Sequence, residues 1–296
     1  IVHCLLLRRM AIGLNVTQLL SILLAPFSPQ MLIRINAWVA GTMWGTMQVS
    51  VPQAARNNEM DITFSGDELP AGENAIVISN HVGMSDYYLI NAVAIRKRMI
   101  SHCSVSTMRD GVPFWGWGMW LCGMLMIKRN WLQDRRRIEA VFHRIRTYRP
   151  PVWVISFLEG TRLSPKKLRE GQAFARSRNL PVLENLLVPR TKGFCETVRQ
   201  LRDTHVKHVY DFTIAYQHSK RGFGVSPSLL RVHSHSLRGE YRFHVHVRRY
   251  AIDDLPNDDE ELAKWVHQTY REKDALLEDL KTNWTGDWNV WRTPLE

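Results

Sequence analysis

Cysteine is scarce in this chain, and the cysteines that occur are widely spaced. Four stand among 296 residues, at positions 4, 103, 122 and 195, and no two form a Cys-x-x-Cys pair. This spacing argues against a zinc site and a disulfide framework, so reduced, mostly buried thiols are expected. Internal repeats and low-complexity segments are also missing. At 45% hydrophobic, the chain can bury one sizeable core or two modest ones.

Long hydrophobic runs are missing as well. The segment 11–27 is apolar and uncharged, yet it falls short of the roughly 20 residues that span a bilayer. A second apolar segment, 35–49, contains Trp38 and Trp44. Two such segments in tandem predict a membrane-associating helical hairpin over residues 1–50, with residues 51–296 forming a second domain. A pair of core helices is the alternative. Because the chain begins with Ile1, its natural start is expected to be missing or processed.

Acidic residues are too few to balance the basic ones. The chain has 28 Asp and Glu against 39 Lys and Arg, which gives a net charge of +11 and a pI near 9.7. An anionic partner is therefore expected: nucleic acid, an acidic membrane surface or a phosphorylated ligand such as coenzyme A. The eleven tryptophans suit a membrane interface, where indole lies between lipid and water.

From about residue 75, short β-like runs alternate with helical stretches. This alternation predicts an α/β fold with a mostly parallel central sheet flanked by helices. The expected strands are 75–79, 101–106, 124–127, 152–157 and 186–188, and the expected helices are 87–98, 131–148 and 163–178. Further strands are expected at 209–217 and 241–249, with a loop at 218–240 and an amphipathic helix at 261–281.

His81 and Asp86 lie directly after the apolar run 75–79, in a block that reads Asn-His-Val-Gly-Met-Ser-Asp over residues 80–86. Imidazole titrates near neutral pH, so it can take a proton from a hydroxyl. A carboxylate on the other ring nitrogen fixes the tautomer and stabilises the cation that forms. The pair predicts a general base, although a His and an Asp at this spacing also recur by chance.

Three further blocks follow in order, each where an apolar strand is expected to end. They read Met-Ile-Lys-Arg-Asn-Trp at 126–131, Phe-Leu-Glu-Gly-Thr-Arg at 157–162 and Leu-Val-Pro-Arg-Thr-Lys-Gly at 187–193. In an open α/β sheet, ligands bind at the edge formed by the carboxyl ends of the strands. The four blocks are therefore expected to meet at one site.

The ordered series resembles the glycerolipid acyltransferases, specifically the long eukaryotic branch of the 1-acylglycerol-3-phosphate (lysophosphatidate) acyltransferases. That family is marked by an NHxxxxD block, a second block ending in Arg, an EGTR block and a fourth block carrying Pro. The resemblance covers the chain from about residue 30 to 288. The second block departs from the family pattern, because Met and Leu fill the space between Gly123 and Ile127, and Lys128 precedes Arg129. This departure leaves the choice of acyl acceptor open.

The resemblance implies an acyl-CoA-dependent O-acyltransferase that acylates a free glycerol hydroxyl of lysophosphatidate or another lysophospholipid. It implies acyl-CoA as a co-substrate, with no other cofactor and no metal. It also implies a membrane-associated enzyme, at the endoplasmic reticulum or alternatively at the mitochondrion. Transfer from a thioester to an alcohol needs a base, which is His81, oriented by Asp86. Backbone N–H groups at the helix start after His81 are expected to bind the developing oxyanion, and no nucleophilic Ser or Cys is required.

Arg162 is the expected ligand of the acceptor phosphate, because a guanidinium binds phosphate oxygens in a bidentate way. Glu159 is expected to hold Arg162 or to bind a glycerol hydroxyl. Gly160 is expected to allow a close backbone approach, and Thr161 to add a hydroxyl donor. The alternative is a structural Glu–Arg pair that shapes a turn.

Lys128 and Arg129 are expected to extend the cationic surface toward the phosphate or coenzyme A. Pro189 is expected to rigidify the entrance for the acyl chain, and Lys192 to meet a coenzyme A phosphate. The alternative for these cations is a solvated, purely structural surface, as is common for short basic clusters.

Two features fit other classes of function. His244 and His246 alternate in an expected strand with no evident third ligand, so an ordinary surface pair is favoured over a metal site.

The positive charge also fits an acyltransferase-fold scaffold or assembly factor in a large complex that contains RNA, with or without retained activity. Cations around the His81 cleft would favour the enzyme, and cations on the opposite face the scaffold.

Overall fold

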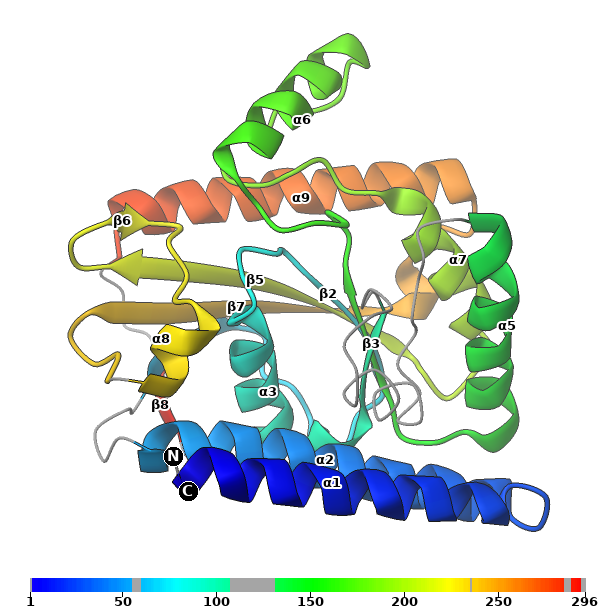
Figure 1. Cartoon of the computed structure of the whole chain (residues 1–296). Coiled ribbons are helices and arrows are strands. Elements are labelled where there is room, and N and C mark those ends of the chain that lie inside the picture. The colour runs from blue at the N-terminus through cyan, green and yellow to red at the C-terminus, as the bar shows by residue number, and fades with distance from the viewer. Residues whose placement is uncertain (1, 55–59, 107–130, 235, 285–288, 294–296) are drawn as a thin grey trace.

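The described residues form an eight-stranded, mixed sheet at the centre of the protein (Figure 1). The computed structural model describes residues 2–54, 60–106, 131–234, 236–284 and 289–293. The strand order is β3-β4-β2-β5-β7-β1-β8, and β6 pairs with β5. The strands are β1 (Met60–Gly66), β2 (Ala75–Ser79), β3 (Cys103–Ser106), β4 (Trp153–Phe157), β5 (His208–His218), β6 (Gly222–Phe223), β7 (Tyr241–Ala251) and β8 (Asn289–Thr293).

The strands that precede the motifs are parallel to one another. β2 pairs in parallel with β4 and β5, and β3 pairs in parallel with β4. The register aligns Ser79 with Phe157 and Phe212, so β2 and β4 end at the same edge. Beyond β5, β7 is antiparallel to β5, β1 is parallel to β7, and β8 is antiparallel to β1. The predicted fold class, with its mostly parallel sheet flanked by helices, is confirmed.

Two hydrophobic cores lie on opposite faces of the sheet, because side chains alternate along each strand. In β2, Ala75 and Val77 belong to one core, and Ile76 and Ile78 to the other. The first core includes α3 (Asp86–Arg96), and the second includes α5 (Trp131–Tyr148), α7 (Thr191–Leu201) and α9 (Asp259–Thr282). Figure 1 shows the resulting helix–sheet–helix layers.

The first two helices, α1 (Val2–Ser21) and α2 (Pro29–Ala54), form an antiparallel hairpin joined through η1 (Ile22–Leu24) (Figure 1). A buried polar clamp holds them together. The Gln18 amide donates to Asn36 Oδ1 at 3.1 Å, and the Asn36 amide donates to Ser21 Oγ at 3.3 Å. The expected helical hairpin is therefore present. In the part of the chain that the structure describes, no helix combines the length and the apolar character needed to cross a membrane.

Helix α2 packs directly on the body of the protein. A Cβ at Gly41 would lie 2.0 Å from Ser101 Oγ, so glycine permits the close approach of α2 to η2 (Ile100–His102). Near the other end of α2, the Gln48 amide donates to the Tyr88 carbonyl of α3 at 3.2 Å. The division into two domains at residue 50 stays a prediction, and α2 itself continues past that position.

Most expected elements are present with small shifts in their ends, but several differ. Residues 186–188 form no strand, because the Leu187 N–H donates to Glu159 and no sheet partner lies alongside. The expected loop 218–240 contains β6 and a short helix, α8 (Leu229–Ser234). β1, β8 and α7 have no counterpart among the expected elements, and the expected strand 124–127 lies outside the described residues. The remaining helices are α6 (Pro165–Ser177), which projects from the body (Figure 1), and η3 (Ile252–Asp254).

Candidate active site

Asn80 fixes the turn that follows β2. Its side-chain amide donates to the Ile214 carbonyl at 2.9 Å, and its Oδ1 accepts the Ile214 N–H at 2.8 Å. The side chain thus pairs with the backbone of the neighbouring strand β5 as a further strand residue would. This pairing places the next residue, His81, at the carboxyl edge of the sheet.

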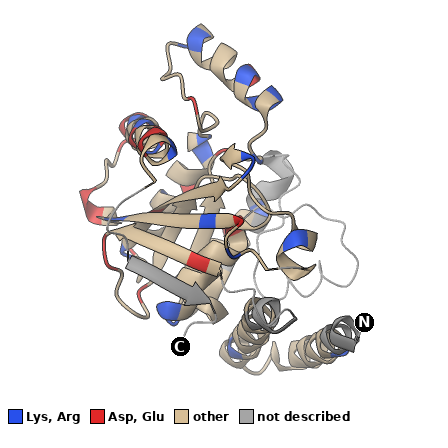
Figure 2. Ribbon diagram, turned by 90° about the vertical axis from the view of Figure 1, so that its left-hand side faces the viewer, with Lys and Arg blue, Asp and Glu red and all other residues tan. Residues whose placement is uncertain are grey.

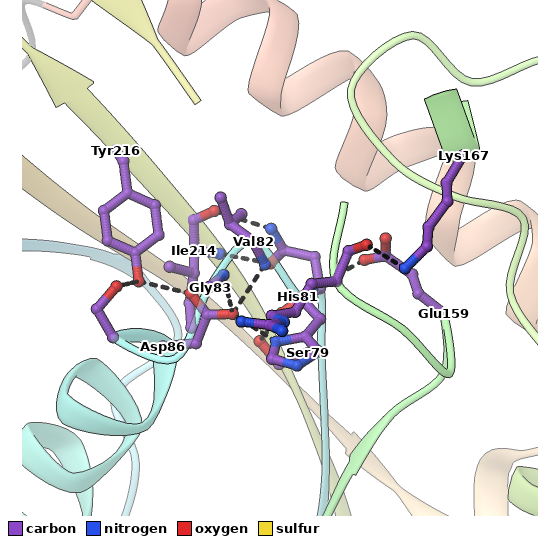
Figure 3. Close-up of polar contacts among 12 residues, drawn as sticks. Ser79, His81, Val82, Gly83, Asp86, Glu159, Lys167, Ile214 and Tyr216 are labelled. Carbon is purple, nitrogen blue, oxygen red and sulfur yellow. Dashed lines mark hydrogen bonds and ion pairs between the residues drawn. The ribbon is translucent and has the colours of Figure 1, made fainter. Parts of the chain in front are cut away.

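Asp86 begins α3 and is fully buried. Its Oδ2 lies 2.8 Å from His81 Nδ1 and accepts the Val82 N–H at 2.8 Å (Figure 3). Gly83 donates its N–H to both carboxylate oxygens, at 3.1 and 3.2 Å, and the Tyr216 hydroxyl donates to Oδ1 at 2.6 Å. The predicted contact between His81 and Asp86 is present, and the carboxylate also closes the turn between them.

This geometry sets the tautomer of His81. A carboxylate accepts, so His81 Nδ1 carries the hydrogen that lies toward Asp86, and Nε2 is the ring nitrogen left to accept a proton. The ring stacks on Phe157 with centroids 4.1 Å apart, and Tyr87 meets it edge-on at 6.3 Å. The side chain of His81 is 13% exposed, so a substrate can reach one part of an otherwise packed ring.

Glu159 braces the backbone on both sides of the site. The carboxylate is buried, and its oxygens accept the His81 N–H at 2.9 Å and the Leu187 N–H at 3.1 Å (Figure 3). Burial raises the pKa of Glu159 to about 8, and these two hydrogen bonds and the charge of Lys273 work against that rise. The structure thus shows this carboxyl group on two backbone amides, whereas the sequence predicts either Arg162 or a glycerol hydroxyl as its partner.

The block 159–162 forms a tight loop beside His81. Gly160 has φ +65°, and a Cβ there would lie 3.1 Å from Arg190 Cδ, so glycine suits both the backbone conformation and the nearby side chain. The Thr161 hydroxyl accepts a hydrogen bond from Lys167 (Figure 3). Arg162 is exposed, and the Leu163 N–H after it donates to the His81 carbonyl at 2.8 Å. This hydrogen bond ties the loop to the backbone of the histidine.

The fourth block brings Arg190 and Lys192 to the same side of the molecule. The Arg190 N–H donates to the Leu158 carbonyl at 2.7 Å, which ties this segment to the end of β4. Pro189 is buried, and Lys192 is exposed in the first turn of α7. Lys128 and Arg129 lie outside the described residues.

The amides expected to bind the oxyanion are those at the helix start after His81, and this expectation stays a prediction. Two amides that precede the helix are already engaged, because the N–H groups of Val82 and Gly83 both donate to Asp86. The N–H of His81 itself donates to Glu159. A carboxylate at the start of a helix competes for the same donors, so these three amides support the turn instead.

The Acyltransferase family matches residues 61–217, more than half of the chain and all of the described site up to Tyr216. The chain belongs to the acyltransferase family. A second family, described as Acyltransferase C-terminus, matches residues 236–294.

Two of the similar proteins are named 1-acyl-sn-glycerol-3-phosphate acyltransferases. The chain is 31% identical over 264 residues to 1-acyl-sn-glycerol-3-phosphate acyltransferase 2 of Brassica napus, covering 87% of this chain and 65% of that protein. It is 31% identical over 283 residues to the human 1-acyl-sn-glycerol-3-phosphate acyltransferase delta, covering 94% and 72%. The chain therefore spans slightly less than two thirds of the length of the Brassica relative.

A solved structure confirms the fold of this acyltransferase-family chain. It is the crystal structure of the 1-acyl-sn-glycerophosphate (LPA) acyltransferase PlsC from Thermotoga maritima, with a TM-score of 0.51 at 13% sequence identity. The match covers 95% of this chain and all of the other. At this identity, the likeness concerns the arrangement of helices and strands.

Helix α9, which lies in the segment matched by the C-terminal family, contacts the strands on which the site is built. In α9, the Tyr270 hydroxyl lies 3.4 Å from the Ser79 carbonyl at the end of β2. Lys273 is fully buried, donates to the Phe212 carbonyl at 2.8 Å and pairs with the buried Asp211 at 2.5 Å. Burial lowers the pKa of Lys273, and the carboxylate of Asp211 opposes this shift. The helix therefore contacts the end of β2, directly before Asn80 and His81, and the middle of β5, the strand that contains Tyr216.

Several residues of the site are absent from the sequence-based set. They are Asn80 and Phe157, which directly adjoin motif residues, the cations Lys167 and Arg190, and Tyr216. Position within a motif could have indicated the first two. The spacing of charges after the third block could have indicated the cations. Tyr216 reaches Asp86 only through the pairing of β2 with β5, which no local pattern contains.

The expectation that His244 and His246 form a surface pair is wrong for His244, which is fully buried. Ser65 Oγ lies 2.8 Å from His244 Nε2 and 2.8 Å from His246 Nδ1, and Thr63 Oγ1 lies 2.8 Å from His244 Nδ1. Burial lowers the pKa of His244 to about 4. The parallel pairing of β1 with β7 creates these contacts, and because β1 is not among the expected elements, the sequence could not reveal them.

Proposed function

We propose that the protein is an acyl-CoA-dependent O-acyltransferase that acylates a free glycerol hydroxyl of lysophosphatidate or another lysophospholipid. The observation that carries the proposal is the 2.8 Å contact of His81 Nδ1 with the buried Asp86 carboxylate, at the sheet edge where the cationic loop 159–163 also lies. The names of the similar proteins, 1-acyl-sn-glycerol-3-phosphate acyltransferases, support this choice of acceptor.

In the proposed reaction, His81 Nε2 takes the proton from the acceptor hydroxyl while the oxygen of that hydroxyl attacks the thioester carbonyl. A new C–O bond forms, and the C–S bond then breaks. The departing thiolate takes the proton back from the imidazolium, so the products are an ester and the free thiol of coenzyme A. The Asp86 carboxylate stabilises the imidazolium between the two transfers. Base catalysis of this kind contributes roughly 10²–10⁴-fold to the rate.

The acceptor phosphate is proposed to bind the exposed guanidinium of Arg162. Arg190 contacts Gly160 in the same loop, and Lys167 holds the Thr161 hydroxyl, so the loop carries further positive charge. Guanidinium groups bind phosphate oxygens in a bidentate way, which orients the glycerol as well as attracting it. Glu159 acts in this proposal by positioning, because both its oxygens hold backbone amides.

The other residues expected at the site have outer roles in the proposal. Lys192, exposed in the first turn of α7, binds a phosphate of coenzyme A, and Lys128 and Arg129 extend the cationic surface toward the phosphates. Pro189 is buried between Arg190 and the Glu159-bonded Leu187. Its fixed φ rigidifies this segment at the entrance for the acyl chain.

Membrane association is proposed to occur through the hairpin. Its outer surface exposes apolar side chains that a protein core would otherwise bury, among them Leu23 at 69% and Phe27 at 85%. Exposed apolar surface of this extent on one element is typical of a lipid-contacting or protein-contacting site. The other exposed apolar residues of the hairpin are Ile12, Val16, Leu19, Leu20, Ile22, Met31 and Trp38. We place the protein at the endoplasmic reticulum, with the mitochondrion as the alternative.

Acyl transfer from acyl-CoA to lysophosphatidate, measured with purified variants, tests the proposed base. We expect His81→Ala and Asp86→Asn each to lower kcat by roughly 10²–10⁴-fold. His143→Ala is the matched control, because His143 is exposed on α5 and is expected to keep the wild-type rate. Wild-type rates in folded His81→Ala and Asp86→Asn proteins would rule the mechanism out.

A further inference from the structure

A pocket of about 330 Å³ lies at the opposite edge of the sheet from His81. It is formed by the first turns of α2, the last turns of α5 and the segments that lead into β3 and β4. Cys103, the first residue of β3, and Val152, directly before β4, both line it. His81 follows the carboxyl end of the parallel strand β2, so roughly one strand length, about 15 Å, separates the two sites.

The polar lining of this pocket is basic. Arg34 comes from α2, Arg144 from α5, Arg149 from the turn after α5, and His102 from η2. Among the described residues that line the pocket, none is acidic. Burial lowers the pKa of His102, so the positive charge at neutral pH comes from the arginines. Three guanidinium groups around one concave surface predict an anionic ligand, and phosphate oxygens match their paired donors.

The position of the pocket indicates where that anion comes from. Arg34 lies on α2 between Met31 and Trp38, whose side chains are 46% and 58% exposed, and Phe27 precedes the same helix. Docking this apolar surface on lipid would bring the first turns of α2, and the pocket beside them, to the level of the headgroups. Tyr148, which also lines the pocket, suits the same depth. Basic pockets beside membrane-contacting helices bind anionic headgroups.

We propose that this pocket binds the phosphate headgroup of an anionic phospholipid in the membrane on which the hairpin docks. The bound lipid is distinct from the acyl acceptor, because it lies at the sheet edge opposite His81. It anchors the protein and orients the hairpin relative to the bilayer. The inference rests on the proposed membrane docking of the hairpin and is independent of acyl transfer.

Binding of the whole protein to phosphatidylcholine vesicles, with and without phosphatidate, tests the inference. The pocket variant is Arg34→Gln with Arg149→Gln, two exposed arginines. The control variant is Arg176→Gln with Arg178→Gln, which removes the same charge from the far end of α6. We expect phosphatidate to tighten binding of the wild type and of the control on the order of tenfold, and to tighten binding of the pocket variant by much less.

Each of the following outcomes would overturn the inference. The pocket variant might bind phosphatidate vesicles as tightly as the control, or both variants could lose the same affinity, which would indicate unspecific surface charge. Binding of inorganic phosphate by the wild type, measured calorimetrically, without any preference for phosphatidate vesicles would assign the pocket to a soluble anion. Equal wild-type binding to both vesicle types would refute the pocket alone, whereas no binding to either would refute the hairpin docking as well. None of these outcomes depends on acyl transfer, which is measured separately.

Discussion

The buried Asp86 carboxylate accepts hydrogen bonds from the Tyr216 hydroxyl, the backbone of Val82 and Gly83, and the ring of His81. A buried carboxylate is costly unless such donors surround it. The same donors prevent the group from rotating, so they also fix the direction of the His81 ring. Asp86 thus connects β5, the turn after β2 and the start of α3 through its hydrogen bonds.

Tyr216→Phe should weaken the positioning of Asp86 without leaving a cavity in the core. The substitution removes one hydrogen bond of 2.6 Å to a carboxylate and leaves the aromatic ring in place. We expect kcat for acyl transfer to fall about tenfold, since hydrogen bonds to charged groups contribute roughly 1.5–3 kcal/mol. Tyr250→Phe, a partly buried tyrosine on β7 packed against Trp265, is the control and should keep the wild-type rate. Equal rates in both variants would mean that Tyr216 does not position Asp86.

Glu159 should make stability depend on pH. Its pKa is about 8 in the folded protein, against 4.5 as its ordinary value. Between these values the folded state holds a proton that the unfolded state releases, so this group lowers the free energy of unfolding as pH rises from about 5 to 8. Glu159→Gln removes the titration, and the Tm of the wild type minus that of the variant should therefore decrease across this range. A difference that is constant or increases with pH would contradict the shift.

The His81–Asp86 contact could be predicted from sequence because both residues lie in one short block, and five positions across a turn into a helix bring side chains together. The partners of Glu159 could not, because backbone N–H groups look alike at every residue. The EGTR resemblance indicated Arg162 or a glycerol hydroxyl as the partner of Glu159, and neither alternative contains the backbone amides of His81 and Leu187. The roles of Lys128, Arg129 and Lys192 stay predictions.

At the scale of elements, local periodicity predicted the units whose burial follows from their own sequence. β2 is apolar up to Ile78 and buried throughout, and α5 occupies the residues expected for it. β1 also has a local signature, because Met60, Ile62 and Phe64 alternate with polar residues and are buried, but its pairing with β7, which lies far along the chain, has none. Residues 186–188 show the converse, because this apolar run lies beside the end of β4 but its Leu187 N–H donates to the Glu159 side chain, and it pairs with no described strand.

The packing of α2 on the body should depend on Gly41. A Cβ there would lie 2.0 Å from Ser101 Oγ and 2.9 Å from Ser101 Cβ, so Gly41→Ala must push the hairpin away. We expect a loss of about 1–3 kcal/mol in the free energy of unfolding, as for other overpacked contacts. Gly45→Ala is the matched control, because a Cβ at Gly45 meets nothing within 4 Å and alanine favours a helix. Calorimetric unfolding should show a lower Tm for the first variant only; equal Tm values would refute the close contact.

At the scale of the whole molecule, some of the described cations lie at both edges of the sheet. Arg162, Lys167 and Arg190 lie at the carboxyl edge, and Arg34 and Arg149 line the pocket at the amino edge. In Figure 2 the described part of the hairpin is mostly tan, whereas α6 carries several blue segments. This distribution does not separate enzyme from scaffold by itself, so a role in an RNA-containing complex stays an untested prediction.

Membrane binding by the hairpin predicts a strong effect of two residues at its turn. Leu23→Ser with Phe27→Ser removes two of the most exposed apolar side chains. We expect affinity for phosphatidylcholine vesicles to fall at least tenfold, since burying such a side chain contributes roughly 1.5–3 kcal/mol. Phe174→Ser with Val182→Ser removes exposed apolar surface from α6 and the segment after it, and should bind as the wild type does. Equal losses in the two variants would contradict docking by the hairpin.

The central claim is that His81, oriented by Asp86, transfers an acyl group from acyl-CoA to a lysophospholipid hydroxyl. The most direct measurement follows the release of coenzyme A thiol and the formation of phosphatidate from lysophosphatidate in one reaction with purified protein. For the wild type, we expect both products to appear in equal amounts, and for folded His81→Ala, both to fall by roughly 10²–10⁴-fold. Phosphatidate formed by His81→Ala at the wild-type rate, or none formed by the folded wild type with any lysophospholipid, would contradict the account.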